Sequence, residues 1–273
     1  VSMLVECRAS GFAGLFDCAK MWHGIHVLGI RSYTGARALL GTGFHAGTAA
    51  FDKARMEGAP ITIDDAAGAV VDAIAERADE CQWRSDDLTR RQVEAKALAL
   101  HTVYCKDVSP QFEFHAVELT LEPLDVDCGD GVIIRLKGTL DRTRIRRDPA
   151  FFDQLGVNDL KSGTRAILPD GRVAIAKHKP QVGIYELTAE HTMKVPITAP
   201  AEIIAADTSS ARPRFAIGTA NNSRELLLGD GEDPGYLRQA AIMFKHDLFP
   251  ANPRSPLCSE RFCPLWSRCK HHD

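Results

Sequence analysis

The sequence predicts an α/β (α+β) fold in which a small mixed sheet is flanked by helices. Two patterns favour this class. Apolar residues recur at helical spacing through residues 34–105, and from about residue 112 onward apolar and polar residues alternate as in strands. The chain has 273 residues, of which 45% are hydrophobic and 25% charged, so it can bury a sizeable core. No linker composition divides the sequence, and we expect one domain over residues 1–273.

Three helices are expected in the N-terminal half, at residues 34–57, 64–81 and 86–105. The first is rich in small residues that permit close packing, and Thr34 is a candidate cap for it. Its buried stripe would consist of Leu39, Leu40, Phe44 and Phe51. The other two fall in residues 53–107, which we expect to form a helical insertion in the domain.

Five strands are expected in the second half, at residues 112–124, 131–145, 155–161, 200–208 and 214–220. The turn signal "CGDG" separates the first two, and Ser162-Gly163 ends the third. Pro180 suits the first position of a helix over residues 179–191. A closing helix is expected over residues 233–249. The order of helices and strands predicts a mixed sheet.

Charge and cysteine usage narrow the class of protein. The net charge of −3 excludes a globally basic surface, so a nucleic-acid site would have to be a local groove. No apolar run is long enough to span a membrane, and no export signal is recognisable, so we expect a cytoplasmic protein. The chain contains eight cysteines, for which metal or cluster binding is then a better explanation than disulfides. Four scattered cysteines are interpreted by default as structural residues: Cys7, Cys81, Cys105 and Cys128.

The segment "GVNDLKSGT" places a carboxylate and an ammonium on one side of a short strand. Side chains alternate along a strand, so Asp159 and Lys161 would share a side, with Leu160 opposite. Asp141 lies on the preceding strand, and adjacent antiparallel strands could bring both carboxylates to one edge. Such a pair binds Mg²⁺ or Mn²⁺, which activates water and stabilises charge on a phosphate, while a lysine orients the water. The alternative is a surface ion pair that contributes little.

Four residues of this pattern resemble the core of the PD-(D/E)XK nucleases, in particular the RecB-type branch. In that family a D…(D/E)-x-K core is accompanied by an upstream histidine in a helix of small residues. Here "GTGFHAG" supplies His45, "GTLD" supplies Asp141, and "NDLKSG" supplies Asp159 and Lys161. The resemblance implies a restriction-endonuclease-like core.

Three further residues extend the resemblance. "QVGIYEL" supplies Gln181 and Tyr185 of a Q-x-x-x-Y motif, and their spacing of four places them on one helix face. Glu118 resembles a glutamate that often precedes the metal-binding strand. The resemblance implies that Mg²⁺ or Mn²⁺ is held by His45, Asp141, Asp159 and the Leu160 carbonyl. It gives Lys161 the role of positioning the attacking water.

The C-terminal cysteines resemble an iron–sulfur bracket. Cys258, Cys263 and Cys269 lie within twelve residues of one another, and Cys18 lies far upstream. In phage exonucleases, bacterial recombination nucleases and CRISPR-adaptation exonucleases of this branch, one early and three late cysteines hold a [4Fe-4S] cluster. Many relatives have two residues between the first and second late cysteines, where this chain has four. Structural Zn²⁺ is the alternative, with His271 or His272 replacing a cysteine.

The resemblance implies a metal-dependent DNA exonuclease of phage or bacterial recombination or repair, acting in the cytoplasm of a bacterium or phage-infected cell. Its partners would be linear DNA ends, double- or single-stranded, and by analogy a single-strand annealing protein. Candidate phosphate contacts are Arg142, Arg144, Lys177 and Lys179. Two alternatives stay open: a structure- or sequence-specific endonuclease of the same fold, and a non-catalytic DNA-binding module.

Overall fold

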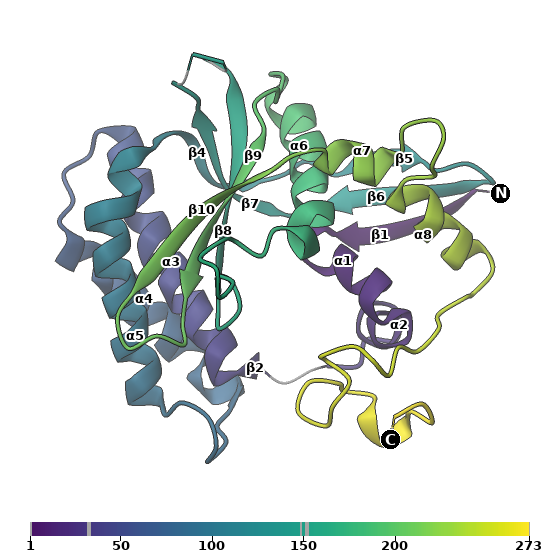
Figure 1. Ribbon diagram of the computed structural model, residues 1–273, viewed down its shortest axis with the longest axis horizontal. Helices are drawn as coiled ribbons and strands as arrows, with labels where there is room; N and C mark the ends of the chain where they lie inside the picture. Colours follow the sequence, from purple (N-terminus) through teal and green to yellow (C-terminus); the bar gives the residue numbers. More distant parts are fainter. Residues whose placement is uncertain (1, 32–33, 148, 151–152, 273) are drawn as a thin grey trace.

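Two sheets organise the computed structural model, which describes residues 2–31, 34–147, 149–150 and 153–272 (Figure 1). A five-stranded sheet has the order β10-β9-β8-β7-β4, and a three-stranded sheet has the order β1-β6-β5. The mixed α/β class expected from the sequence is confirmed. No helix within the described ranges is both long and apolar enough to cross a membrane.

The described part of the N-terminal half contains one six-residue strand, two two-residue strands, two short helices and three longer helices. Its elements are β1 (Met3–Arg8), α1 (Ala9–Asp17), α2 (Ala19–His26), β2 (Thr34–Gly35), α3 (Ala36–Glu57), α4 (Ile63–Arg77), β3 (Cys81–Gln82) and α5 (Arg90–Val103). A π-helical turn, Tyr104–Val108, follows α5. Short 3₁₀ turns here and later lie at Ala78–Glu80, Ser109–Gln111, Ala176–His178 and Trp266–Arg268.

The second half supplies most of the strands. Its elements are β4 (Glu113–Thr120), β5 (Leu124–Asp127), β6 (Val132–Lys137), β7 (Thr139–Ile145), β8 (Leu155–Gly163), α6 (Lys179–Met193), β9 (Ala201–Asp207), β10 (Arg214–Ala220), α7 (Ser223–Leu228) and α8 (Tyr236–Lys245). Strand β7 is antiparallel to both β4 and β8. Strand β8 is parallel to β9, and α6 makes the crossover between them, as a parallel pair requires.

The prediction of one strand over residues 131–145 was wrong. The chain leaves one sheet and enters the other at Gly138, so β6 pairs with β1 and β5, whereas β7 pairs with β4 and β8. A Cβ at Gly138 would lie 3.3 Å from the Tyr185 ring and 3.4 Å from the Ala9 Cβ, so this crossing point is tightly packed. The switch places Asp141 in the five-stranded sheet.

Helix α3 lies against one side of the five-stranded sheet and α6 lies against the other (Figure 1). Leu160 and Ile204 pack with α3–α5, whereas Val157 and Ile203 pack with α6 and α1. Helices α4 and α5 pack against α3. The contact with α4 depends on small residues, because a Cβ at Gly43 would lie 2.6 Å from Ile74.

Local signals explain where the helices begin. Thr62 with Asp65 and Thr89 with Gln92 form capping boxes, so α4 starts at residue 63 and α5 at residue 90. The expectation that Thr34 caps α3 was wrong. Thr34 instead pairs with Cys81 in the short β2–β3 ladder, and Gly35 precedes the helix.

Candidate active site

Side chains from three elements meet where β7 and β8 stop pairing. The β7–β8 register runs from Ile145–Leu155 to Arg142–Asn158, and one residue beyond it Asp141 and Asp159 face the gap. The Leu160 amide donates to Asp141 Oδ2 at 2.8 Å, and His45 Nδ1 on α3 lies 3.7 Å from the same oxygen. The strand ends and α3 therefore bring an imidazole and two carboxylates together.

Lys161 and Asp159 form the ion pair expected from their strand spacing. The Lys161 ammonium lies 2.8 Å from Asp159 Oδ1 and 2.7 Å from Oδ2. Asp159 is completely buried, whereas the Lys161 side chain is 20% exposed. This contact is therefore not the surface ion pair of the alternative interpretation, because a buried carboxylate is strongly destabilised without its partner.

The pKa values of the two carboxyl groups are shifted in opposite directions. Burial raises the pKa of Asp159, and the nearby charge of Asp141 adds to the rise, while Lys161 opposes both. Burial would also raise the pKa of Asp141, but His45, Lys161 and Arg142 together hold it below its usual value. Paired carboxylates with separated pKa values are typical of catalytic sites.

Glu118 adjoins this pair from β4 in an unusual backbone conformation. Its φ is +52°, in the left-handed region that non-glycine residues rarely adopt. Val117 pairs with Arg142 and Leu119 with Leu140, so Glu118 lies opposite Asp141. Burial of the carboxyl group and the charge of Asp141 raise its pKa, although the residue as a whole is exposed. Strain of this kind clusters at functional sites.

Gln181 and Tyr185 share one face of α6, as their spacing of four residues predicted. Gln181 Nε2 donates to the Tyr185 hydroxyl at 2.9 Å, and both side chains are buried. Burial raises the pKa of Tyr185, and the charges of Asp159 and Asp141 raise it further. The tyrosine hydroxyl therefore stays protonated and remains a hydrogen-bond donor beside the carboxylates.

A cationic segment follows β8. Burial lowers the pKa of Lys177, and so do the charges of Arg165 and Lys161. Burial and the charges of Lys161 and Lys177 lower the pKa of His178 to about 3, so His178 is neutral near pH 7. Lys179 opens α6 beside them. Lys177 and His178 thus lie within electrostatic reach of Lys161.

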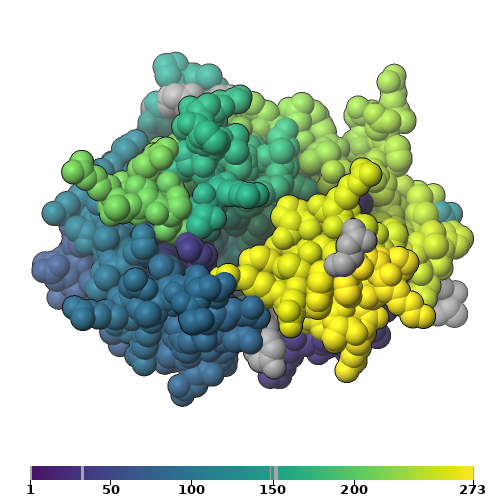
Figure 2. Space-filling view, turned by 60° about the horizontal axis from the view of Figure 1, so that its bottom comes forward, coloured from purple at the N-terminus to yellow at the C-terminus, as the bar shows by residue number. Residues whose placement is uncertain are grey.

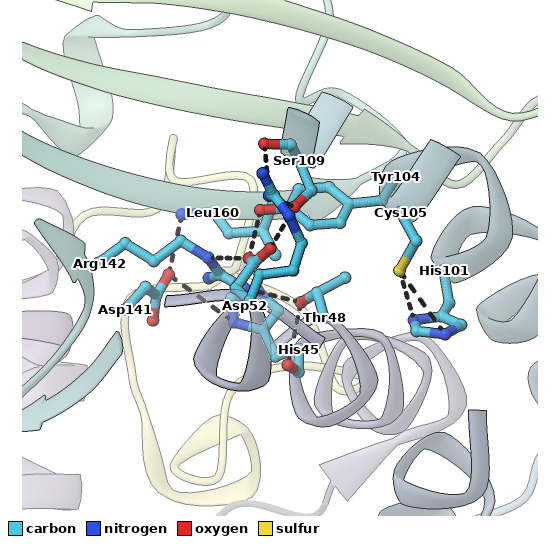
Figure 3. Close-up of polar contacts among 11 residues, drawn as sticks. His45, Thr48, Asp52, His101, Tyr104, Cys105, Ser109, Asp141, Arg142 and Leu160 are labelled. Carbon is cyan, nitrogen blue, oxygen red and sulfur yellow. Dashed lines mark hydrogen bonds and ion pairs between the residues drawn. The ribbon is translucent and has the colours of Figure 1, made fainter. Parts of the chain in front are cut away.

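The expectation that Arg142 contacts DNA was wrong. Its side chain is completely buried, and its Nε donates to Asp52 Oδ2 at 2.6 Å (Figure 3). Arg144 is also largely covered: its side chain is 12% exposed, stacks on Phe112 and pairs with Glu202. Both arginines lie on β7, and helices cover both faces of its sheet, so their side chains are buried or largely covered. The sequence did not reveal that both faces are covered.

The hydrogen-bond partners of Arg142 form a polar network that the sequence did not indicate. Asp52 also accepts from the Tyr104 hydroxyl at 2.7 Å and from Ser109 Oγ at 2.5 Å (Figure 3). Arg142 Nη2 donates to Thr48 Oγ1 at 3.0 Å. One signal was present: Thr48 and Asp52 lie three and seven residues after His45, on the same stripe of α3.

The donor set of the candidate site fits a hard divalent cation chemically, although its side chains are turned toward protein partners. Carboxylates and carbonyls suit Mg²⁺ and Mn²⁺, and an imidazole is compatible with Mn²⁺. Over the described parts of the chain, no group of three or more His, Cys, Asp or Glu side chains is arranged to hold a metal ion. Asp141 faces the Leu160 amide and His45, and Asp159 faces Lys161, so metal binding would compete with these contacts.

The four cysteines of the expected bracket lie together. Cys18, Cys258, Cys263 and Cys269 line one cavity of about 10 Å³, all as free thiols. Burial raises the pKa of the Cys263 thiol, and the other three thiols are close enough to affect it. The rest of the lining consists of apolar and polar residues: Met21, Ala251, Pro253, Leu265 and Trp266, with Lys20, Asn252 and His271. His271 is one of the two histidines of the zinc alternative. The four thiols therefore share one cavity, but in the described parts of the chain they are not arranged as a metal-holding group.

Figure 2 shows that one face of the molecule is hollowed. The rim consists of the blue helices of the N-terminal half, the teal and green segments near β8 and β10, and the yellow C-terminal segment. Arg261 of the C-terminal segment pairs with Asp86 and Asp87 in the turn before α5, so blue and yellow regions touch along this rim. The mouth of the hollow is therefore shaped by segments distant in sequence.

An Asp-x-Lys strand, a second aspartate on the neighbouring strand and a histidine from the covering helix lie together on a mixed α/β core, as the resemblance to a nuclease core implied. The family model of the PD-(D/E)XK nuclease superfamily matches residues 9–270, nearly the whole chain. The chain therefore belongs to the PD-(D/E)XK nuclease superfamily, whose members typically use Mg²⁺ or Mn²⁺. No curated protein matches the sequence significantly.

Proposed function

We propose that this protein is a metal-dependent deoxyribonuclease that degrades linear DNA from its ends. The observation that carries the proposal is that α3, β7 and β8 bring together His45, Asp141, Asp159 and Lys161. His45 lies beside Asp141, and Lys161 pairs with Asp159. The superfamily match makes DNA the substrate class. A decayed, non-catalytic module would be expected to have lost one of these groups.

In this proposal each residue has a defined role. His45, Asp141, Asp159 and the Leu160 carbonyl would hold the cation, which when bound activates water and stabilises charge on the phosphate. Lys161 orients the attacking water with its ammonium group, and Tyr185 donates a hydrogen bond beside the carboxylates. Glu118 adds a third carboxylate opposite Asp141. Lys177, Lys179 and Arg165 attract the phosphate backbone.

The biological setting is the finer part of the proposal. We place the chain in the RecB-type branch, in phage or bacterial DNA recombination or repair within the cytoplasm, with a single-strand annealing protein as companion. We also propose that Cys18, Cys258, Cys263 and Cys269 hold a [4Fe-4S] cluster that ties the two ends of the domain together. The shared cavity of the four free thiols supports this part of the proposal.

A cleavage assay tests the central proposal. Anaerobically purified protein is first checked for iron, zinc and visible absorbance: an iron–sulfur spectrum supports the cluster, and stoichiometric zinc without it overturns the cluster. The protein is then incubated with end-labelled linear DNA and a covalently closed circle, with Mg²⁺, Mn²⁺ or EDTA. We expect metal-dependent loss of the linear DNA alone.

Lys161→Ala is the decisive variant. We expect it to fold with reduced stability, because Asp159 loses its partner. We expect it to lose at least about 100-fold of the cleavage rate, the usual size of a proton-transfer or electrostatic contribution. Lys137→Ala is the matched control, because Lys137 pairs with Glu6 in the other sheet. Cutting of the circle would replace the exonuclease with an endonuclease. Unchanged turnover of Lys161→Ala would remove the site assignment.

A further inference from the structure

The same two elements, α3 and β7, carry both the candidate catalytic pair and a completely buried ion pair. His45 on α3 faces Asp141 on β7. Seven residues further along α3, Asp52 binds Arg142, the residue that follows Asp141. The two pairs thus lie about two helical turns apart along one helix–strand contact. A helix joined to a strand at Asp52 cannot rotate or slide without moving His45.

The buried pair is held from several directions. Both oxygens of the Asp52 carboxylate are occupied, Oδ2 by Arg142 and Tyr104 and Oδ1 by Ser109. Ser109 in turn accepts from Arg55, one turn further along α3. The Arg142 guanidinium lies over the Tyr104 ring at 5.5 Å from its centroid. The π-helical turn that begins at Tyr104 allows Tyr104 and Ser109 to reach the same carboxylate.

Arg142 also contacts the turn of α3 nearest to His45. Its Nη2 donates to Thr48 Oγ1 at 3.0 Å, and Thr48 Oγ1 donates to the His45 carbonyl oxygen at 3.0 Å (Figure 3). A continuous chain of polar contacts therefore connects Asp52, Arg142 and Thr48 to the backbone of His45. The sequence neighbour of Arg142 is Asp141, so both ends of the chain reach the catalytic pair.

A buried ion pair is a poor device for stability alone, because apolar residues of similar volume often serve as well or better. What it supplies is one defined arrangement of the groups that it joins. We propose that Asp52 and Arg142 are positioning residues, which fix α3 on β7 so that the His45 imidazole faces the Asp141 carboxylate. The inference rests on the proposed nuclease function and adds two residues that act through others without touching the substrate.

The test replaces the charges without leaving one unpaired. In the triple variant Asp52→Leu/Tyr104→Phe/Arg142→Met this part of the core becomes largely apolar, and we expect the variant to fold. We expect kcat on linear DNA to fall by about 10-fold to 100-fold, because a displacement of about 1 Å can cost that much. KM should stay within about twofold, because DNA contacts are untouched. Asp125→Ala/Arg135→Ala, which removes an exposed ion pair of the other sheet, should change neither value.

A cycle with His45→Ala separates positioning from a general structural role. If the network acts through His45, His45→Ala costs much less in the triple variant than in the wild type. Equal costs, or an unchanged kcat in a folded triple variant, would overturn the proposal. Arg142→Lys provides a second variant if the triple does not fold. It keeps the charge but cannot reach Asp52 and Thr48 together, and should show the same losses on a smaller scale.

A structural readout keeps this inference distinct from the proposed function. The crystal structure of Arg142→Lys is expected to show His45 Nδ1 displaced from its 3.7 Å separation from Asp141 Oδ2. An unchanged separation contradicts the positioning role even if the enzyme is active. A wild-type chain that cleaves no DNA overturns the proposed function, and the structure of the variant still decides the positioning role.

Discussion

Glu118 combines backbone strain with a carboxylate beside the candidate catalytic pair. Its φ of +52° is one that glycine adopts at little cost, whereas other L-residues pay about 1–2 kcal/mol. The β4–β7 ladder continues on either side of this residue, at Val117 and Leu119. The strained residue brings its carboxyl group within electrostatic range of Asp141.

Substitution of Glu118 should therefore separate stability from activity. We expect Glu118→Gly to be more stable than Glu118→Ala by about 1 kcal/mol, because only glycine relieves the strain. Both variants should lose activity to a similar degree, because both lack the carboxylate. Chemical denaturation and the linear-DNA assay measure the two effects. Equal stabilities would mean that the conformation is unstrained, and an active Glu118→Gly would remove Glu118 from the site.

At the scale of residues, the sequence predicted which side chains pair better than it predicted which side chains are buried. The alternation of a strand was sufficient to place Asp159 and Lys161 together, and helical spacing was sufficient to pair Gln181 with Tyr185. Arg142 was misinterpreted because a charged residue usually lies at a surface. Its burial depends on Asp52, which is ninety residues away, and no local pattern could reveal that pairing.

Helix α6 carries a buried carboxylate whose titration affects folding. Burial raises the pKa of Glu186 to about 7, and Arg224 on α7 only partly offsets the effect. The unfolded chain would titrate near 4.5. Between these values the folded state binds more protons than the unfolded state, so the free energy of unfolding falls as pH rises. The associated stability is present below about pH 4.5 and is lost as pH rises through about 7.

We expect Glu186→Gln to flatten this part of the pH profile. In the wild type the carboxyl group should cost on the order of 3 kcal/mol of unfolding free energy between pH 4.5 and 8, because its pKa is about 7 in the folded chain and 4.5 in the unfolded chain. Urea unfolding of both proteins at several pH values gives the comparison. Parallel profiles for the two proteins would show that another group is responsible.

At the scale of elements, the sequence predicted most helices and strands but not how the strands divide. Residues 131–145 form a continuous alternating pattern, but its halves enter different sheets at Gly138, where Tyr185 and Ala9 pack closely. The edge strand β1 went unrecognised because its partner β6 lies more than a hundred residues away. Capping boxes at Thr62 and Thr89 could have given the starts of α4 and α5 from local sequence.

At the scale of the whole molecule, the C-terminal segment joins parts of the chain that no motif connects. Asn252 donates to the Asp17 carbonyl oxygen, and Ser255 donates to the Asp17 carboxylate, so the segment is anchored on α1 and α2. Arg261, between Cys258 and Cys263, extends to the other side of the hollow and pairs with Asp87. Asp87 also pairs with Arg37 at the start of α3, at 3.3 Å.

Asp87 therefore connects the cysteine-rich segment to the helix that carries His45. Its side chain is 6% exposed, so loss of a partner matters more than for a pair in open solvent. Arg37 remains in place when Arg261 is removed. Removal of Arg261 should therefore loosen the C-terminal segment but leave the fold of the two sheets intact.

We expect Arg261→Ala to speed amide hydrogen exchange in residues 255–269 at least about tenfold, equivalent to about 1.4 kcal/mol of local opening. Exchange in β8 and α6 should stay unchanged, because neither contacts Arg261. Arg268→Ala, in the same segment but outside this contact, is the matched control. Equal protection in the wild type and Arg261→Ala would mean that the cysteine cavity alone holds the segment. Faster exchange confined to the segment would instead establish that the salt bridge between Arg261 and Asp87 holds this part of the rim of the hollow in place.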